Sequence, residues 1–159
     1  MIDDAPRGNL IYRLGYGTAR KLRNLARVRA AYRRGLVDTR GRPADIRVEP
    51  AGACNLRCPL CPTGLGEIDR PASIMKPEVF SRILDRHALD IFHIKFHIWG
   101  EPLVNPELAI LVSMAQARHV GAEISTNLSV NLSDATIDAL IRAGLAWMIV
   151  SLDGTSEEA

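Results

Sequence analysis

The stretch EPAGACNLRCPLCP, residues 49–62, holds every cysteine of the chain within eight positions. These cysteines are Cys54, Cys58 and Cys61, in the spacing Cys-x3-Cys-x2-Cys. Tight turns bring sulfurs three and four positions apart close enough to share one cluster, so this loop can bind three irons of a 4Fe-4S cubane. The fourth iron would then have no ligand from the loop. A vacant metal position of this kind is what distinguishes a reactive metal site from a closed structural one.

Three other interpretations of these cysteines are open. A disulfide with one thiol left over is disfavoured by the odd number of cysteines and by the lack of a secretory signal. Buried, inert cysteines are a second alternative. A structural zinc site is the strongest alternative, but its fourth ligand would have to be a histidine outside the loop. The candidates for that ligand are His87, His93, His97 and His119.

The sequence after this loop alternates between strand and helix patterns. Strands are predicted at residues 46–49, 92–99, 122–126 and 147–152 from apolar residues that recur with a period of two. Helices are predicted to begin near Pro77, at Pro106 with Asn105 as its cap, and after a cap at Ser133; the last two are expected to end before Gly121 and at Gly144. Repeated strand–helix units of this length predict an α/β fold with parallel strands and helices on the outside.

Polar residues recur on one face of each predicted strand. They are Arg47, Glu49, His93, Lys95, His97, Glu101, Glu123, Ser125, Asn127, Ser151 and Asp153. A parallel sheet that is buried on both faces would be almost continuously apolar. We therefore expect one apolar face beneath the helices and one polar face that lines a cavity, with a polar face in water as the alternative. Chemistry in β/α barrels usually takes place at the carboxyl ends of such strands.

Residues 1–43 form a basic segment. It carries eleven lysines and arginines against three acids, although the net charge of the whole chain is only +2. Apolar residues recur in it at near-helical spacing, which predicts an amphipathic helix: Leu22, Leu25, Val28, Tyr32 and Leu36. We expect this apolar stripe to pack on the domain and the arginines to be solvated. Contact with nucleic acid, an anionic membrane or an acidic partner is the alternative.

Three further stretches accompany the cysteine loop in order: WGEPL at 99–103, STN at 125–127 and SLDG at 151–154. With that loop, they resemble the motifs of the radical S-adenosylmethionine (radical SAM) superfamily, in the subgroup whose longer members carry a SPASM-type extension. The resemblance covers roughly residues 44–159. It implies a partial parallel (β/α) barrel of about four strands, the N-terminal part of a radical SAM core domain, preceded by the basic helical arm.

The resemblance also implies roles for particular residues. Cys54, Cys58 and Cys61 would bind the 4Fe-4S cluster. Gly100 and Glu101 match the part of the family that contacts the amine of S-adenosylmethionine, although Trp99 replaces a glycine that often precedes them. Leu60 stands where an aromatic residue often helps to seat the adenine. The residues expected to contact the ribose or the methionyl carboxylate are Ser125, Asn127 and Ser151, and Leu128 replaces a glycine that often follows the asparagine.

The chemistry implied is reductive cleavage of S-adenosylmethionine to a 5′-deoxyadenosyl radical that abstracts hydrogen from a substrate, a peptide or another small molecule. A protein such as flavodoxin or ferredoxin would supply the electron. The composition, 47% hydrophobic and 24% charged without a membrane-length apolar run, predicts a cytoplasmic protein. The alternative is a structural metal-binding or interaction module with an arginine-rich docking helix.

The last residues, 155–159, have the pattern of a helix start without the helix that should follow. We therefore expect the core domain to be truncated at its C-terminus, so that this chain on its own is not necessarily active. The last strand would lack a covering helix. Its apolar residues Met148, Val150 and Leu152 are then expected to be partly exposed, which favours aggregation.

Overall fold

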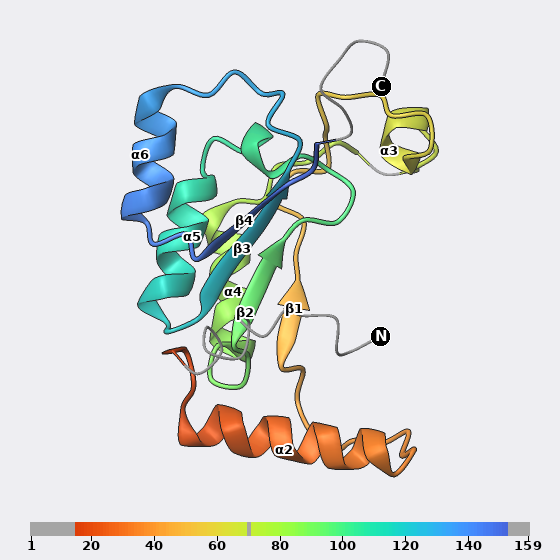
Figure 1. Ribbon diagram of the computed structural model, residues 1–159, viewed down its shortest axis with the longest axis vertical. Coiled ribbons are helices and arrows are strands. Elements are labelled where there is room, and N and C mark those ends of the chain that lie inside the picture. Colours follow the sequence, from red (N-terminus) through yellow and green to blue (C-terminus); the bar gives the residue numbers. More distant parts are fainter. Residues whose placement is uncertain (1–14, 70, 153–159) are drawn as a thin grey trace.

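A computed structural model describes residues 15–69 and 71–152 of the chain (Figure 1). The described helices are α2 (Ala19–Arg33), α3 (Pro62–Leu65), α4 (Pro77–His87), the 3-10 helix η1 (Pro102–Val104), α5 (Leu108–Ala117) and α6 (Asp134–Arg142). The strands are β1 (Asp45–Arg47), β2 (His93–Phe96), β3 (Gly121–Thr126) and β4 (Trp147–Val150). No helix among the described residues is long and apolar enough to cross a membrane.

The four strands form one parallel sheet in the order of the sequence, β1-β2-β3-β4. Ile46 pairs with Ile94, Ile94 with Ala122, and Ile124 with Met148. Helices α4, α5 and α6 connect successive strands, as parallel pairing requires. Because neither β1 nor β4 closes the sheet, the expected α/β fold with a partial barrel is confirmed.

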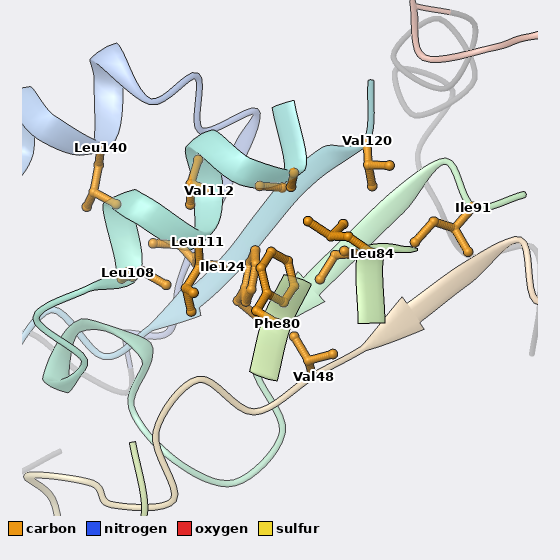
Figure 2. Close-up of a cluster of buried hydrophobic side chains, with 14 of the residues drawn as sticks. Val48, Phe80, Leu84, Ile91, Leu108, Leu111, Val112, Val120, Ile124 and Leu140 are labelled. Atoms are coloured by element: carbon orange, nitrogen blue, oxygen red, sulfur yellow. The ribbon is translucent and has the colours of Figure 1, made fainter. Parts of the chain in front are cut away.

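The hydrophobic core lies between the sheet and its helices (Figure 2). Ile94 and Phe96 of β2 and Ile124 of β3 are fully buried there. Phe80 of α4 packs on Phe96 with ring centroids 5.2 Å apart. Successive side chains of a strand point to opposite faces, so His93, Lys95 and Glu123 share the other face. The predicted division into an apolar and a polar face is therefore present.

Two helices begin as the sequence predicts. Proline at the first position of α4 has a fixed φ that suits a helix start. At α6, the side chain of Ser133 accepts a hydrogen bond from the backbone N–H of Thr136. The third predicted start, at Pro106 with Asn105 as its cap, is wrong, because α5 begins at Leu108. Asn105 instead uses its side chain to bind the carbonyls of Pro50 (2.9 Å) and Met75 (3.1 Å), which fixes the chain before the helix.

Helix α2 lies across the N-terminal edge of the sheet, away from the cysteine loop (Figure 1). Its predicted mode of packing is wrong, since Leu22, Tyr32 and Leu36 are all exposed. The helix docks instead through polar side chains. Lys21, which is 2% exposed, donates a hydrogen bond to the carbonyl of His119, and Asn24 binds the loop before β1. Arg20 of α2 also forms a bidentate ion pair with Asp90.

Strand β4 is exposed along its whole length. Met148 and Val150 each expose about two fifths of their surface, and Leu152 exposes 72%. This exposure confirms the prediction made for these three residues, because no described element covers this edge of the sheet.

Candidate functional site

The cysteine loop folds back over the carboxyl end of β2. Close backbone contact holds it there, since the N–H of Glu101 donates to the carbonyl of Ala53 (2.9 Å). A Cβ on Gly100 would stand 1.8 Å from the carbonyl oxygen of Ala51, a distance that no side chain can occupy. Glycine is therefore required at position 100, because only a residue without a side chain lets the two segments touch.

Two side chains fix this contact from either side. The carboxylate of Glu49 accepts hydrogen bonds from the backbone N–H groups of Trp99 (2.8 Å) and Gly100 (2.9 Å). The hydroxyl of Thr63, just after the last cysteine, donates to the carbonyl of Trp99 (2.9 Å). Both ends of the cysteine loop are thus anchored to the segment that carries Gly100.

Glu101 is buried, with 3% of its surface exposed. Its Oε1 accepts hydrogen bonds from the N–H of Leu103 (3.1 Å) and the hydroxyl of Thr126 (2.7 Å), and its Oε2 accepts one from the N–H of Asn127 (2.9 Å). The carboxylate therefore joins the carboxyl ends of β2 and β3. Its predicted contact with the amine of S-adenosylmethionine remains a prediction.

Asn127 connects β3 to the cysteine loop. Its Nδ2 donates to Oδ1 of Asn55 (3.1 Å) and approaches Sγ of Cys54 (3.7 Å). The next residue, Leu128, has φ of +53°, in the left-handed region that favours glycine. This explains why glycine, which often follows the asparagine in the family, suits position 128. The loop retains that backbone turn without the glycine.

The three cysteines are free thiols, each half-buried. Cys61 precedes α3, and hydrogen bonds lower its pKa, first from the backbone N–H of Gly64 and then from Thr63. The N–H of Leu56 points to Sγ of Cys54 (3.5 Å). The hydrogen bonds to Cys61 favour its thiolate form, which is the form that binds iron. The residues of the loop thus fit a cluster bound by three cysteines.

The zinc and disulfide alternatives find no support in the described part of the chain. A single tetrahedral ion needs ligand sulfurs about 4 Å apart. Residues 15–69 and 71–152 contain no group of three histidine, cysteine or acidic side chains placed to bind one ion. A cubane accepts wider spacing, because each cysteine binds a different iron.

The remaining predicted residues are only partly brought together. The hydroxyls of Ser125 and Ser151 lie 3.4 Å apart on neighbouring strands, beside Asn127. Leu60 is 95% exposed and is not packed against them. Asp153, which the sequence placed on the polar face, lies outside the described residues. Their roles toward S-adenosylmethionine remain predictions.

A charged group occupies the middle of the polar face. Nζ of Lys95 lies 3.3 Å from a carboxylate oxygen of Glu123, and Nε2 of His97 lies 4.0 Å from the same oxygen. Burial lowers the pKa of His97 despite the nearby carboxylate. Lys95 belongs to β2, Glu123 belongs to β3, and His97 follows directly after β2.

Sequence reasoning missed three residues that shape the site: Glu49, Thr63 and Thr126. Glu49 had been placed on the polar face, and its position five residues before Cys54 was a usable signal. Thr63 adjoins the cysteine-loop stretch and Thr126 lies inside the STN stretch, but their partners are 36 and 25 residues away. Only the folded sheet brings these pairs into contact.

The fold and the site define a class of protein: a parallel α/β sheet that carries a three-cysteine loop over the carboxyl ends of its strands. A family model described as the Radical SAM superfamily matches residues 48–159. The chain belongs to this superfamily, whose members use a 4Fe-4S cluster and S-adenosylmethionine. The SPASM association remains a prediction.

Relatives of established function support this assignment. The chain is 30% identical over 116 residues to PqqA peptide cyclase of Gluconobacter oxydans, covering 72% of this chain and 32% of the cyclase. It is 35% identical over 133 residues to GTP 3′,8-cyclase of Streptomyces coelicolor, covering 79% and 38%. The structure of BtrN in complex with AdoMet and 2-DOIA superimposes with a TM-score of 0.60 at 26% identity, covering 71% of this chain and 47% of BtrN. The chain spans about a third of the length of the two cyclases.

Proposed function

We propose that this chain is the cofactor-binding part of a radical SAM enzyme. One observation carries the proposal: the three-cysteine loop is hydrogen-bonded to Gly100 through Glu49, and to β3 through Asn127. These contacts bring the WGEPL and STN stretches against the cysteine loop, which supports the proposal. Cys54, Cys58 and Cys61 would bind the cluster.

Cys54, Cys58 and Cys61 would hold the cluster, which together with S-adenosylmethionine would supply one-electron reductive cleavage and hydrogen abstraction from the substrate. The protein supplies orientation. Gly100 lets the cysteine loop pack directly on the end of β2, and Glu101 holds the ends of β2 and β3 in position. The hydroxyls of Ser125 and Ser151 and the amide of Asn127 offer hydrogen bonds to the ribose and carboxylate.

The substrate we propose is a peptide or another small molecule that reaches the polar face of the sheet. Lys95, His97 and Glu123 lie on that face and provide charged and hydrogen-bonding groups. A reducing protein such as flavodoxin or ferredoxin would provide the electron. A cytoplasmic location belongs to the same proposal, because three free thiols at a metal loop suit a reducing compartment.

Anaerobic reconstitution with iron and sulfide, followed by electron paramagnetic resonance of the reduced chain, tests the proposal. We expect a 4Fe-4S signal that changes when S-adenosylmethionine is added. The triple variant Cys54→Ser, Cys58→Ser, Cys61→Ser should give no cluster signal.

Ser151→Ala separates cluster binding from cofactor binding, because the described contact of the Ser151 hydroxyl is with Ser125 and not with the cysteine loop. The variant keeps all three cysteines, so it should still form the cluster but show a weaker response to S-adenosylmethionine. A wild-type chain that binds zinc and no iron–sulfur cluster would overturn the proposal.

A further inference from the structure

The basic arm forms a hollow at the opposite end of the sheet from the cysteine loop. Its volume is about 260 Å³. Helix α2 and the segment between α2 and β1 provide its walls, and the lining residues are Arg20, Arg23, Asn24, Arg27, Arg40, Arg42 and Asp90. Five guanidinium groups therefore surround a space with one acidic residue.

The charges around this hollow are not balanced by the protein. Asp90 is already committed to Arg20, whose two bonds to it measure 2.8 and 2.9 Å. Within residues 15–69 and 71–152, Arg23, Arg27 and Arg42 form no ion pair, and Arg40 has only a 4.0 Å contact with Asp38. Converging like charges repel one another, so a bound anion would stabilise this arrangement.

The loop that carries Arg40 and Arg42 is held tightly against the helix. Asn24 donates to the carbonyl of Arg42 (2.9 Å) and accepts from its N–H (2.8 Å). A Cβ on Gly41 would lie 2.6 Å from Cγ2 of Val28, so only glycine allows this close approach. Arg40 itself has φ of +48°, a conformation that is unfavourable for a residue with a side chain. The backbones of the two walls are therefore held against each other, and their arginine side chains surround the hollow.

We propose that this hollow binds a diphosphate group of a small molecule. Guanidinium groups form bidentate, charge-assisted hydrogen bonds with phosphate oxygens, and adjacent phosphates offer several such oxygens within a small volume. Arginines on two facing walls suit a compact anion. An extended polyanion would instead follow a single row of arginines along the helix.

The remaining arginines of α2 provide a matched control. Arg29 and Arg33 lie on another side of the helix, where they line a separate hollow with Leu22 and Leu25. Removing these two charges changes the net charge of the arm as much as removing Arg23 and Arg42 does. Of these two pairs, only Arg23 and Arg42 line the proposed site.

Isothermal titration calorimetry of the full chain with inorganic pyrophosphate tests the proposal. Arg23→Gln with Arg42→Gln should weaken pyrophosphate binding by about tenfold or more, because each guanidinium provides charge-assisted hydrogen bonds. Arg29→Gln with Arg33→Gln should leave binding within about twofold of wild type after this change of distant charge. Inorganic phosphate should bind more weakly than pyrophosphate. Circular dichroism melting of each variant checks that the fold is retained.

Three results would overturn the proposal. The first is no pyrophosphate binding at millimolar concentration in low salt. The second is an equal loss of binding in both double variants, which would indicate only a general effect of charge. The third is that a single-stranded oligonucleotide or phosphatidylglycerol vesicles bind more tightly than pyrophosphate, and that both double variants weaken this binding. That result would identify an extended anionic partner. None of these measurements requires a cluster, so the test is independent of the proposed enzyme activity.

Discussion

The carboxylate of Glu101 joins the end of β2 to the end of β3, 25 residues away in the sequence. It accepts three hydrogen bonds while almost fully buried. The motif around it was recognisable from the sequence, but these partners were not, because Thr126 and Asn127 reach it only when β2 and β3 pair. Its role in the apoprotein is to position the site.

Replacing this carboxylate tests that positioning role. Glu101→Gln replaces one acceptor oxygen with an NH2 group that faces protein donors. We expect the free energy of unfolding to fall by about 2–3 kcal/mol, the effect of leaving a buried polar group unsatisfied. Urea unfolding measures the change. Glu107→Gln, which removes a surface ion pair with Lys76, should cost less than about 1 kcal/mol. Equal losses in the two variants would contradict the role.

Leu128 provides a second test at the scale of one residue. The left-handed backbone at Leu128 costs an L-residue about 1–2 kcal/mol in the folded state. Glycine avoids this cost, but it loses more conformational entropy on folding, which costs about 0.5–1 kcal/mol. Leu128→Gly should therefore raise the free energy of unfolding by about 0.5–1 kcal/mol. The matched control is Leu89→Gly, at an exposed leucine without positive φ, which should be destabilising. Thermal unfolding of both variants measures whether each substitution raises or lowers the free energy of unfolding.

At the scale of elements, periodicity located all four strands and the end of β3 at Thr126, but it placed the ends of the other three strands too late. The predicted strand 92–99 stops at Phe96, because residues 97–101 leave the ladder and Glu49 captures the N–H groups of Trp99 and Gly100. Periodicity also identified α2 but assigned the wrong face to the domain. The error arose because Lys21 and Asn24 find buried backbone partners, which hydropathy alone does not predict.

The burial of Lys21 makes the docking of α2 depend on pH. Burial lowers its pKa to about 8, below the value of about 10.4 in an unfolded chain. Between these values the unfolded chain binds more protons, so stability should rise with pH. Relative to Lys21→Met, the wild type should gain up to about 3 kcal/mol between about pH 8 and pH 10.5.

Urea unfolding at a series of pH values measures this difference. The control is Lys76→Met, since Lys76 is exposed and its pair with Glu107 raises its pKa. The difference between the wild type and Lys76→Met should show no comparable rise in this window. A flat difference between the wild type and Lys21→Met would contradict a buried, destabilised cation.

For the whole molecule, the open edge at β4 is the main liability. All four residues of this strand are exposed, and among the described strands only β3 pairs with it. Exposed apolar edge strands pair with other chains, which leads to aggregation. The sequence predicted this exposure because the expected covering helix was missing from the pattern.

A charge on that edge should therefore improve solubility. Ile149→Lys should reduce light scattering at high concentration while lowering the free energy of unfolding by no more than about 1 kcal/mol. Ile110→Lys is the control, since Ile110 is as exposed as Ile149 but belongs to α5. A similar reduction by both variants would mean that net charge, and not the strand edge, governs the aggregation.

The dependence of the cysteine loop on distant partners has a consequence for the order of assembly. The loop region is held by hydrogen bonds between Glu49 and Trp99, between Glu101 and Ala53, and between Asn127 and Asn55, and each of these pairs is far apart in the sequence. The loop can close only after β1, β2 and β3 have paired, because those contacts have long sequence separations. We expect iron and sulfide to enter a chain that has already folded. Such maturation differs from that of zinc fingers, in which the metal itself drives folding.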